Sequence, residues 1–246
     1  MDIRTERIQI PSDGKTMGGY LARPTDDLAR PAVLVFMEIF GVNFHIREVT
    51  DRVAAEGYVA LAPDFFHRTG PGAEYGYDED GFAKGMALLN QLSADEMIAD
   101  AQAALASLRA RKDVKGDQVG AMGFCIGGHM TYLTACETDV RAAASFYGGG
   151  IAAPQGPGGG PSTLGRTSQI QGRILCLFGE RDGLIPSDQV EAIQAALAKG
   201  GIRHDTVVYP GADHGFFCDQ RGTYQKAAAD DAWERVKSLF AEELAG

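Results

Sequence analysis

Short apolar runs alternate with amphipathic stretches along most of the 246-residue chain. The run Ala32–Met37 is apolar at every position, which is typical of a strand buried on both faces of a parallel sheet. The stretch Ile46–Ala55 instead carries its apolar residues at helical spacing. The strands that this pattern predicts are Arg7–Ile10, Gly18–Ala22, Ala32–Met37, Tyr58–Ala62, Val119–Phe124, Ala142–Tyr147, Ile174–Phe178 and Thr206–Tyr209.

Amphipathic helices are expected between most of these strands. Ser93 and Glu96 form a capping-box pattern at the start of one of them. The helices that the spacing predicts are Ile46–Ala55, Asp80–Gln91, Ser93–Ala110, Ile126–Cys136, Ser187–Ala198 and Tyr224–Glu243. Alternating strands and helices are typical of a mostly parallel sheet with helices on both faces. We therefore predict one α/β domain over residues 1–246, with functional residues in loops at the carboxyl ends of the strands.

The segment 148–165 contains two runs of three glycines. This composition is typical of a flexible connection between two strands, and a lid over the site is the alternative. The segment is not a phosphate-binding loop, because the lysine of that motif is missing.

The composition narrows the possible partners. The formal net charge of −10 argues against nucleic acid and against an anionic membrane surface, because both need a basic protein surface. No apolar run approaches the roughly 20 residues that a membrane helix needs, and Met1–Pro11 lacks an apolar signal region. The four cysteines form no C-x-x-C pair, so we expect reduced thiols. These observations favour a cytoplasmic protein, a monomer or small homo-oligomer, that acts on a small molecule.

Cys125 is the strongest candidate for a nucleophile. It lies in Gly123–Gly128 (GFCIGG), between a predicted strand and a predicted helix. This is a nucleophile-elbow pattern, in which the turn is so tight that small residues must flank the nucleophile. The N–H of Ile126, at the start of the helix, would then face the negative charge that develops on a substrate carbonyl. The alternative is a buried structural cysteine, which is the commonest fate of a free cysteine.

Asp182 and His214 are the candidates for the acid and the base that would activate this thiol. Each follows a late predicted strand, and the order nucleophile, acid, histidine is the one that nucleophile-elbow enzymes have. Asp188 and Asp213 are the alternatives for the acid. The other histidines are scattered and show no H-x-H or H-E-x-x-H pattern, so we expect no metal site.

Glu38 and Ile39 follow the strand Ala32–Met37 at a glycine turn, within the letters EIFGVN. This placement predicts that Glu38 lies above the sheet near Cys125. It also makes the N–H of Ile39 the candidate for a second oxyanion donor. The alternative for Glu38 is a carboxylate that only stabilises a helix N-terminus.

These motifs together resemble the dienelactone hydrolase family. The resemblance rests on EIFGVN, PDFF at Pro63–Phe66, GFCIGG and the late aspartate and histidine, which follow that family's order over essentially the whole chain. It implies an α/β-hydrolase fold without a large cap domain, a triad of Cys125, His214 and Asp182, and no cofactor. It also implies that Glu38 hydrogen-bonds the resting thiol and is displaced when substrate binds.

The resemblance has further implications for substrate binding. Tyr147 matches a tyrosine beside the family's site. Prototype members hold a substrate carboxylate with two arginines, and Cys218 and Phe82 stand at those positions in this chain. Lys84 is the nearest cation to the second position, and Arg221 is an alternative. A lysine does not replace a bidentate arginine conservatively, so the substrate is expected to differ from that of the prototypes.

The expected reaction is hydrolysis of an activated carboxylic ester or an enol lactone through a thioester on Cys125. A thiolate leaves more readily than an ordinary alkoxide, so the reaction needs a substrate with a good leaving group. Phe40 and Phe216 are further candidates for contacts with substrate. The alternatives are a broad carboxylesterase or thioesterase, or a promiscuous organophosphate hydrolase, on the same triad. A non-catalytic ligand-binding protein on the same fold is the third hypothesis.

Overall fold

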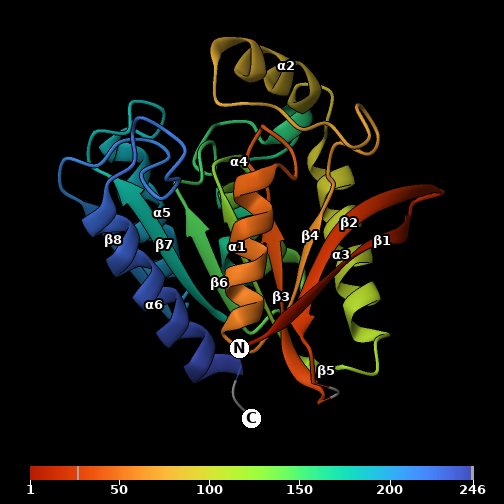
Figure 1. Cartoon of the computed structure of the whole chain (residues 1–246). Helices are drawn as coiled ribbons and strands as arrows, with labels where there is room; N and C mark the ends of the chain where they lie inside the picture. Colours follow the sequence, from red (N-terminus) through yellow and green to blue (C-terminus); the bar gives the residue numbers. More distant parts are fainter. Residues whose placement is uncertain (27, 245–246) are drawn as a thin grey trace.

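The eight predicted strands form one sheet. The computed structural model describes residues 1–26 and 28–244. Its strands lie in the order β1-β2-β4-β3-β5-β6-β7-β8 (Figure 1). Their bounds are β1 Ile3–Ser12, β2 Lys15–Pro24, β3 Arg30–Phe36, β4 Val59–Pro63, β5 Val114–Phe124, β6 Ala142–Phe146, β7 Arg173–Gly179 and β8 His204–Tyr209. Strand β2 pairs antiparallel with β1 and β4, and the pairs from β4 across to β8 are parallel. The predicted α/β fold with a mostly parallel sheet is confirmed.

Helices cover both faces of this sheet. They are α1 Phe44–Ala55, α2 Glu79–Leu89, α3 Ala94–Arg109, α4 Ile126–Glu137, α5 Ser187–Lys199 and α6 Lys226–Leu244, with the 3₁₀ helices η1 Pro157–Gly159 and η2 Thr163–Gln169. Figure 1 shows α1 and α6 in front of the sheet, and α3 and α4 pack against its other face. The predicted capping box is present, since the side chains of Ser93 and Glu96 each accept the other residue's backbone N–H. No helix in the described part of the chain is both long and apolar enough to span a bilayer.

The central strands are buried on both faces. Every residue of β4 and β6 is buried, as are the last seven residues of β5. Burying a Val or Leu side chain stabilises a fold by about 1.5–3 kcal/mol, so these apolar strands hold the sheet together. The edge strand β8 is only partly buried. The parallel strands all end at one edge of this rigid sheet, and loops at that edge carry the predicted functional residues.

Helix α2 lies above the carboxyl ends of the parallel strands (Figure 1). The side chain of Asp78 caps it by accepting the N–H of Gly81 at 2.7 Å. The helix approaches the sheet closely, because a Cβ at Gly85 would lie only 2.2 Å from the carbonyl oxygen of Ile39. The short helix α2 therefore covers this edge of the sheet, and its position depends on Gly85.

The glycine-rich segment 148–165 connects β6 to β7, as its position between two predicted strands implies. His129 of α4 holds it at two points. Its Nδ1 lies 2.9 Å from the carbonyl oxygen of Gly149, and its Nε2 lies 2.7 Å from the hydroxyl oxygen of Thr163. Composition alone could not indicate these tertiary hydrogen bonds, which tie the segment to α4.

Candidate active site

Cys125 forms the turn between β5 and α4. Its backbone has φ 58° and ψ −120°, a combination that residues other than glycine rarely adopt. Its N–H donates to the carbonyl oxygen of Phe146 in β6 at 3.1 Å. This hydrogen bond anchors the strained turn to the neighbouring strand, and the thiol lines a cavity at the carboxyl edge of the sheet.

Three glycines make this turn possible. A Cβ at Gly123 would lie 2.3 Å from the carbonyl oxygen of Gly127. A Cβ at Gly127 would lie 2.4 Å from that of Phe36, and a Cβ at Gly128 would lie 2.3 Å from that of Phe146. Real Cβ atoms do not approach backbone this closely, so each position needs a glycine for the helix to pack on the sheet. The GFCIGG pattern therefore has a steric cause.

Asp182 and His214 form a buried hydrogen-bonded pair on the loops after β7 and β8. Nδ1 of His214 and Oδ2 of Asp182 are 2.8 Å apart. The other oxygen of Asp182 accepts the N–H of Leu184 at 2.9 Å, so the carboxylate is held from both sides. Nε2 of His214 is buried and has no hydrogen-bond partner among the described residues. This nitrogen is thus available to exchange a proton with a group in the cavity.

Neither alternative acid is hydrogen-bonded to the His214 ring among the described residues. Oδ1 of Asp213 accepts the backbone N–H of His214 at 2.7 Å. Asp188 is exposed in the first turn of α5. Asp182 is thus the carboxylate that orients the His214 ring.

Glu38 is fully buried and is paired with Arg221. Nη1 of Arg221 donates to Oε1 of Glu38 at 3.1 Å. The guanidinium carbon of Arg221 also lies 5.8 Å from the ring centre of Phe40 and 5.7 Å from that of Tyr77. No hydrogen bond joins Glu38 to the Cys125 thiol in residues 1–26 and 28–244. The implied hydrogen bond between Glu38 and the resting thiol is thus replaced here by a pairing with an arginine.

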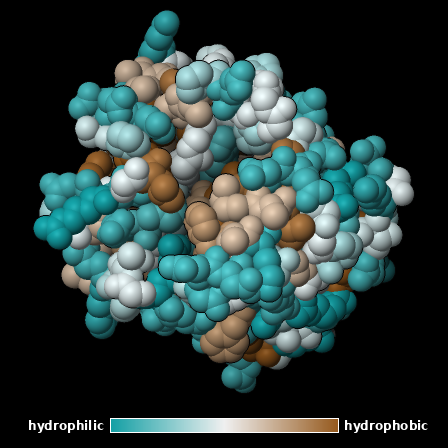
Figure 2. All heavy atoms as spheres, turned by 90° about the horizontal axis from the view of Figure 1, so that it is seen from above, coloured by the Kyte–Doolittle hydropathy of each residue, from teal (hydrophilic) through white to brown (hydrophobic). Residues whose placement is uncertain are grey.

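One cavity of about 370 Å³ joins these groups. Its lining includes Cys125, His214, Arg221 and the α2 side chains Phe82, Met86 and Leu89. Seen from above, apolar side chains gather around the hollowed middle of this face, while the periphery is mostly hydrophilic (Figure 2). Arg221 is the one arginine or lysine among the described residues that line the cavity. An apolar cavity with a few converging polar groups is typical of a small-molecule site.

The model of the dienelactone hydrolase family matches residues 17–244. The chain belongs to the dienelactone hydrolase family. A Synechocystis protein named "Putative carboxymethylenebutenolidase" is 46% identical over 245 residues, which cover 99% of each chain. An Escherichia coli protein of the same name is 34% identical over 242 residues, which cover 94% of this chain and 84% of that protein.

Solved structures agree with this assignment. A crystal structure from Klebsiella pneumoniae, described as a "Putative Dienelactone Hydrolase", has a TM-score of 0.89 and 32% sequence identity over 98% of this chain and 100% of that chain. The dienelactone hydrolase-like promiscuous phosphotriesterase P91 from metagenomic libraries has a TM-score of 0.85 at 23% identity over 100% of each chain, a likeness of fold alone. As a member of the dienelactone hydrolase family, this chain is an enzyme that hydrolyses ester bonds.

The cavity is also lined by three other residues that were predicted for the site, namely Ile39, Phe40 and Ile126. Ile126 is the first residue of α4, and the first N–H groups of a helix have no acceptor within it. Its amide is therefore available to a ligand.

Three predicted substrate contacts lie outside the cavity lining. Tyr147 is fully buried, with its ring edge-on to His214 at a centroid distance of 5.0 Å. Phe216 is packed behind it, 5.3 Å from the Tyr147 ring centre. Lys84 is exposed on α2, where its ammonium group is bonded to Asp80. Tyr147 and Phe216 can therefore support the His214 ring, whereas Lys84 points its charge into solvent.

The apolar wall of the cavity was not predicted as a binding surface. Phe82, Met86 and Leu89 line it from α2, and Leu184 lines it from the loop after β7. The spacing of four and then three residues in α2 marks one helical face, which was a usable signal. An apolar helix face of this kind is usually assigned to the hydrophobic core, but this face of α2 lines the cavity.

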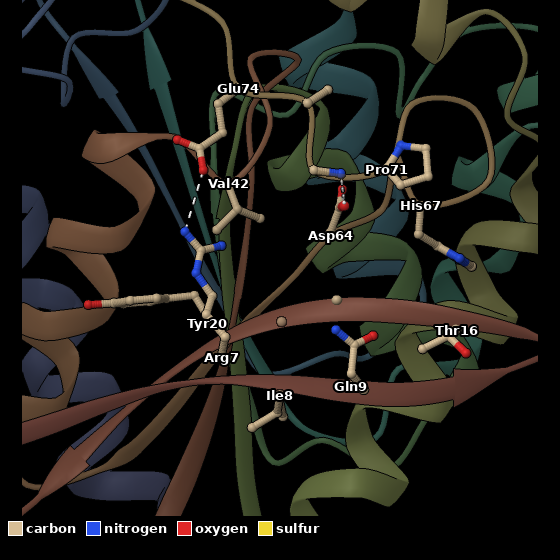
Figure 3. Close-up of a pocket in the computed structure, with 14 residues that line it drawn as sticks. Arg7, Ile8, Gln9, Thr16, Tyr20, Val42, Asp64, His67, Pro71 and Glu74 are labelled. Atoms are coloured by element: carbon tan, nitrogen blue, oxygen red, sulfur yellow. Dashed lines mark hydrogen bonds and ion pairs between the residues drawn. The ribbon is translucent and has the colours of Figure 1, made fainter.

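A second cavity, of about 400 Å³, lies between the β1–β2 hairpin and the segment 64–74 (Figure 3). Its charged groups are already paired. Arg7 donates to Glu74 at 3.5 Å, and Asp64 accepts the N–H of Gly72 at 2.7 Å. Its described lining residues include no cysteine. The cavity at Cys125 is therefore the candidate active site, although it is the slightly smaller one.

The charge state of His214 depends on its neighbours. Burial disfavours the charged imidazole, but negative charge on Cys125 and the hydrogen bond to Asp182 outweigh it and raise the pKa of His214 to about 10. The folded-state pKa exceeds the ordinary value of 6.5. Proton binding by His214 therefore stabilises the fold fully below pH 6.5, and that stabilisation is lost as the pH rises through about 10.

We expect the pKa of His214 to fall when Cys125 is replaced by Ser, because the serine hydroxyl carries no negative charge. An NMR titration of the His214 ring measures this directly, with His214→Gln identifying the resonance. The wild-type ring should titrate near pH 10. Equal titration midpoints in wild type and Cys125→Ser would show that Cys125 does not raise the pKa of His214.

Proposed function

We propose that this enzyme hydrolyses activated carboxylic esters or enol lactones, with Cys125 as nucleophile, His214 as base and Asp182 as the residue that orients the base. The observation that supports this most is the thiol on a strained turn, in the same cavity as the buried His214–Asp182 pair. The names of the relatives, which refer to lactone hydrolysis, agree with this substrate class.

In the first half of the reaction, the Cys125 sulfur attacks the acyl carbon and the carbonyl electrons move onto oxygen. The N–H groups of Ile126 and Ile39 are proposed to stabilise this oxyanion, and donors of this kind contribute roughly 3–4 kcal/mol each. The tetrahedral intermediate collapses to a thioester. His214 gives its proton to the departing oxygen of the alcohol or enol.

In the second half, neutral His214 takes a proton from water, and the resulting hydroxide attacks the thioester. The thiolate leaves, the acid product departs, and His214 is again an imidazolium. Asp182 keeps the ring in the tautomer that leaves Nε2 facing the reacting atoms. Each proton that His214 donates is thus recovered within the cycle.

The sulfur nucleophile restricts the substrate. A thiolate is a better leaving group than an alkoxide, so a tetrahedral intermediate from an ordinary ester tends to revert. An enolate or phenolate leaves readily and lets the reaction go forward. Amides, with a poorer leaving group still, are expected to be poor substrates.

The cavity favours an amphiphilic acyl group. Phe82, Met86, Leu89 and Leu184 offer apolar contacts, and Arg221 offers a guanidinium for a carboxylate. A substrate carboxylate would compete with Glu38 for this guanidinium. We propose that Arg221 takes the part that Lys84 was expected to play. The predicted cytoplasmic location and the monomer or small homo-oligomer remain part of this proposal.

Replacing Cys125 by Ala should lower kcat for an aryl ester by about 10⁴-fold or more, because the covalent route is lost. Steady-state assays of an aryl ester, an enol lactone, an aryl amide and an aryl phosphotriester measure this and separate the alternatives. Activity on the phosphotriester, lost with the same substitution, would favour the promiscuous organophosphate hydrolase. Cys136→Ala, in the buried part of α4, is the control and should retain activity. Undiminished ester turnover by Cys125→Ala would contradict the nucleophile.

Replacing Arg221 by Gln should raise KM for a carboxylate-bearing lactone by about 10- to 100-fold, the worth of one charged hydrogen bond. KM for a neutral aryl ester should change little, because such a substrate has no anion to pair. Comparing the two KM ratios is the measurement. Lys84→Gln is the matched control, since that side chain lies on the exposed face of α2. Equal effects of Arg221→Gln on both KM values would show that Arg221 only stabilises the folded site and does not bind the substrate carboxylate.

A further inference from the structure

Three buried side chains that take no part in the proposed bond-making or proton-transfer steps lie close together. The carboxylate of Glu38, a ring nitrogen of His45 and the sulfur of Cys218 lie within 4.8 Å of one another. All three residues are buried. They come from the turn after β3, the first turn of α1 and the loop after β8, so only the folded chain brings them together.

Two atoms of this cluster have no partner. Oε1 of Glu38 binds Arg221, but Oε2 is buried without a hydrogen bond among the described residues. Nε2 of His45 is also buried and unpaired within that part of the chain. A buried polar atom left unsatisfied destabilises a fold by about 1–3 kcal/mol, so two such atoms in residues of one cluster point to a ligand there.

The donor types identify the class of ligand. A cysteine sulfur, an imidazole nitrogen and a carboxylate oxygen are the groups that bind zinc in proteins, and three protein ligands leave one position for water. The other ring nitrogen of His45, Nδ1, lies 3.9 Å from the carboxylate of Asp219, which is too far for a hydrogen bond. Asp219 would have to move closer to act as the outer carboxylate of a metal-bound histidine.

We propose that Glu38, His45 and Cys218 form a binding site for a thiophilic divalent cation of the Zn²⁺ type. Bonds of about 2.0–2.3 Å place tetrahedral ligand atoms less than about 4 Å apart, so the side chains need to close by roughly 1 Å. The thiol of Cys218 releases its proton to solvent on binding. The carboxylate of Glu38 and the new thiolate then face the two charges of the cation and the charge of Arg221, so the four groups together carry a net charge of +1.

This inference does not depend on the triad, because it uses neither Cys125 nor His214, although Glu38 is also the partner of Arg221 in the proposed substrate site. It changes the expectation from the sequence, in which no motif indicated a metal site. The ligands are far apart along the chain and fit no spacing rule, so only the fold can reveal them.

Cobalt binding to the Cys125→Ser protein tests the site, because that background removes the thiol in the active-site cavity. Co²⁺ bound to a thiolate gives a charge-transfer absorption in the near ultraviolet, and Zn²⁺ should displace it. We expect saturation at one Co²⁺ per chain. The band should disappear when Cys218→Ser is added and persist when Cys136→Ser is added as the matched control.

His45→Gln in the Cys125→Ser background provides a second variant that keeps all the thiols of the proposed site. It should weaken Co²⁺ binding by at least about 10-fold, with thermal unfolding used to verify that the protein is folded. A thiolate band that survives Cys218→Ser, or saturating Co²⁺ that produces no thiolate band at all, would overturn the proposal. Every one of these variants is expected to lack ester hydrolysis because Cys125 is replaced. Hydrolytic activity is therefore not used to judge the proposal.

Discussion

The close backbone packing around Cys125 is the constraint on which the rest of the site depends. The chain passes from β5 into α4 through one residue with a left-handed backbone, anchored by its N–H to Phe146 in the next strand. Flanking glycines let α4 lie against β3 and β6 at distances that no Cβ would allow. This packing fixes the start of α4, whose first residue, Ile126, lines the same cavity as Cys125.

The parallel sheet supplies the other groups from the same edge. Neighbouring strands β7 and β8 end side by side, so the loops that follow them bring Asp182 and His214 to 2.8 Å. The turn after β3 contributes Glu38, and Arg221 reaches it from the loop after β8. Apolar burial of the central strands stabilises the sheet and holds these charged groups in place, although each loop alone would be mobile.

The features that the sequence predicted correctly are those that leave a local pattern of residues along the chain. Strands buried on both faces read as uninterrupted apolar runs, which is why the central strands were found, and the glycines of the elbow reflect a steric requirement. The partner of Glu38 could not be found in this way, because Arg221 is far along the chain and no spacing rule connects them. The position of Lys84 outside the cavity could not be predicted from the sequence for a related reason. Which face of α2 covers the cavity depends on how Gly85 seats the helix on Ile39, a contact between distant segments.

The central claim is that Cys125 carries the acyl group during turnover. The most direct test is a single-turnover experiment with excess enzyme and an aryl acetate, quenched in acid at successive times and analysed by peptide mass spectrometry. The account predicts that an acetyl group appears on the peptide containing Cys125, as a thioester sensitive to hydroxylamine, and decays as acetate is released. Acetyl groups on another residue, or complete hydrolysis without acylation of Cys125 at any time, would contradict it.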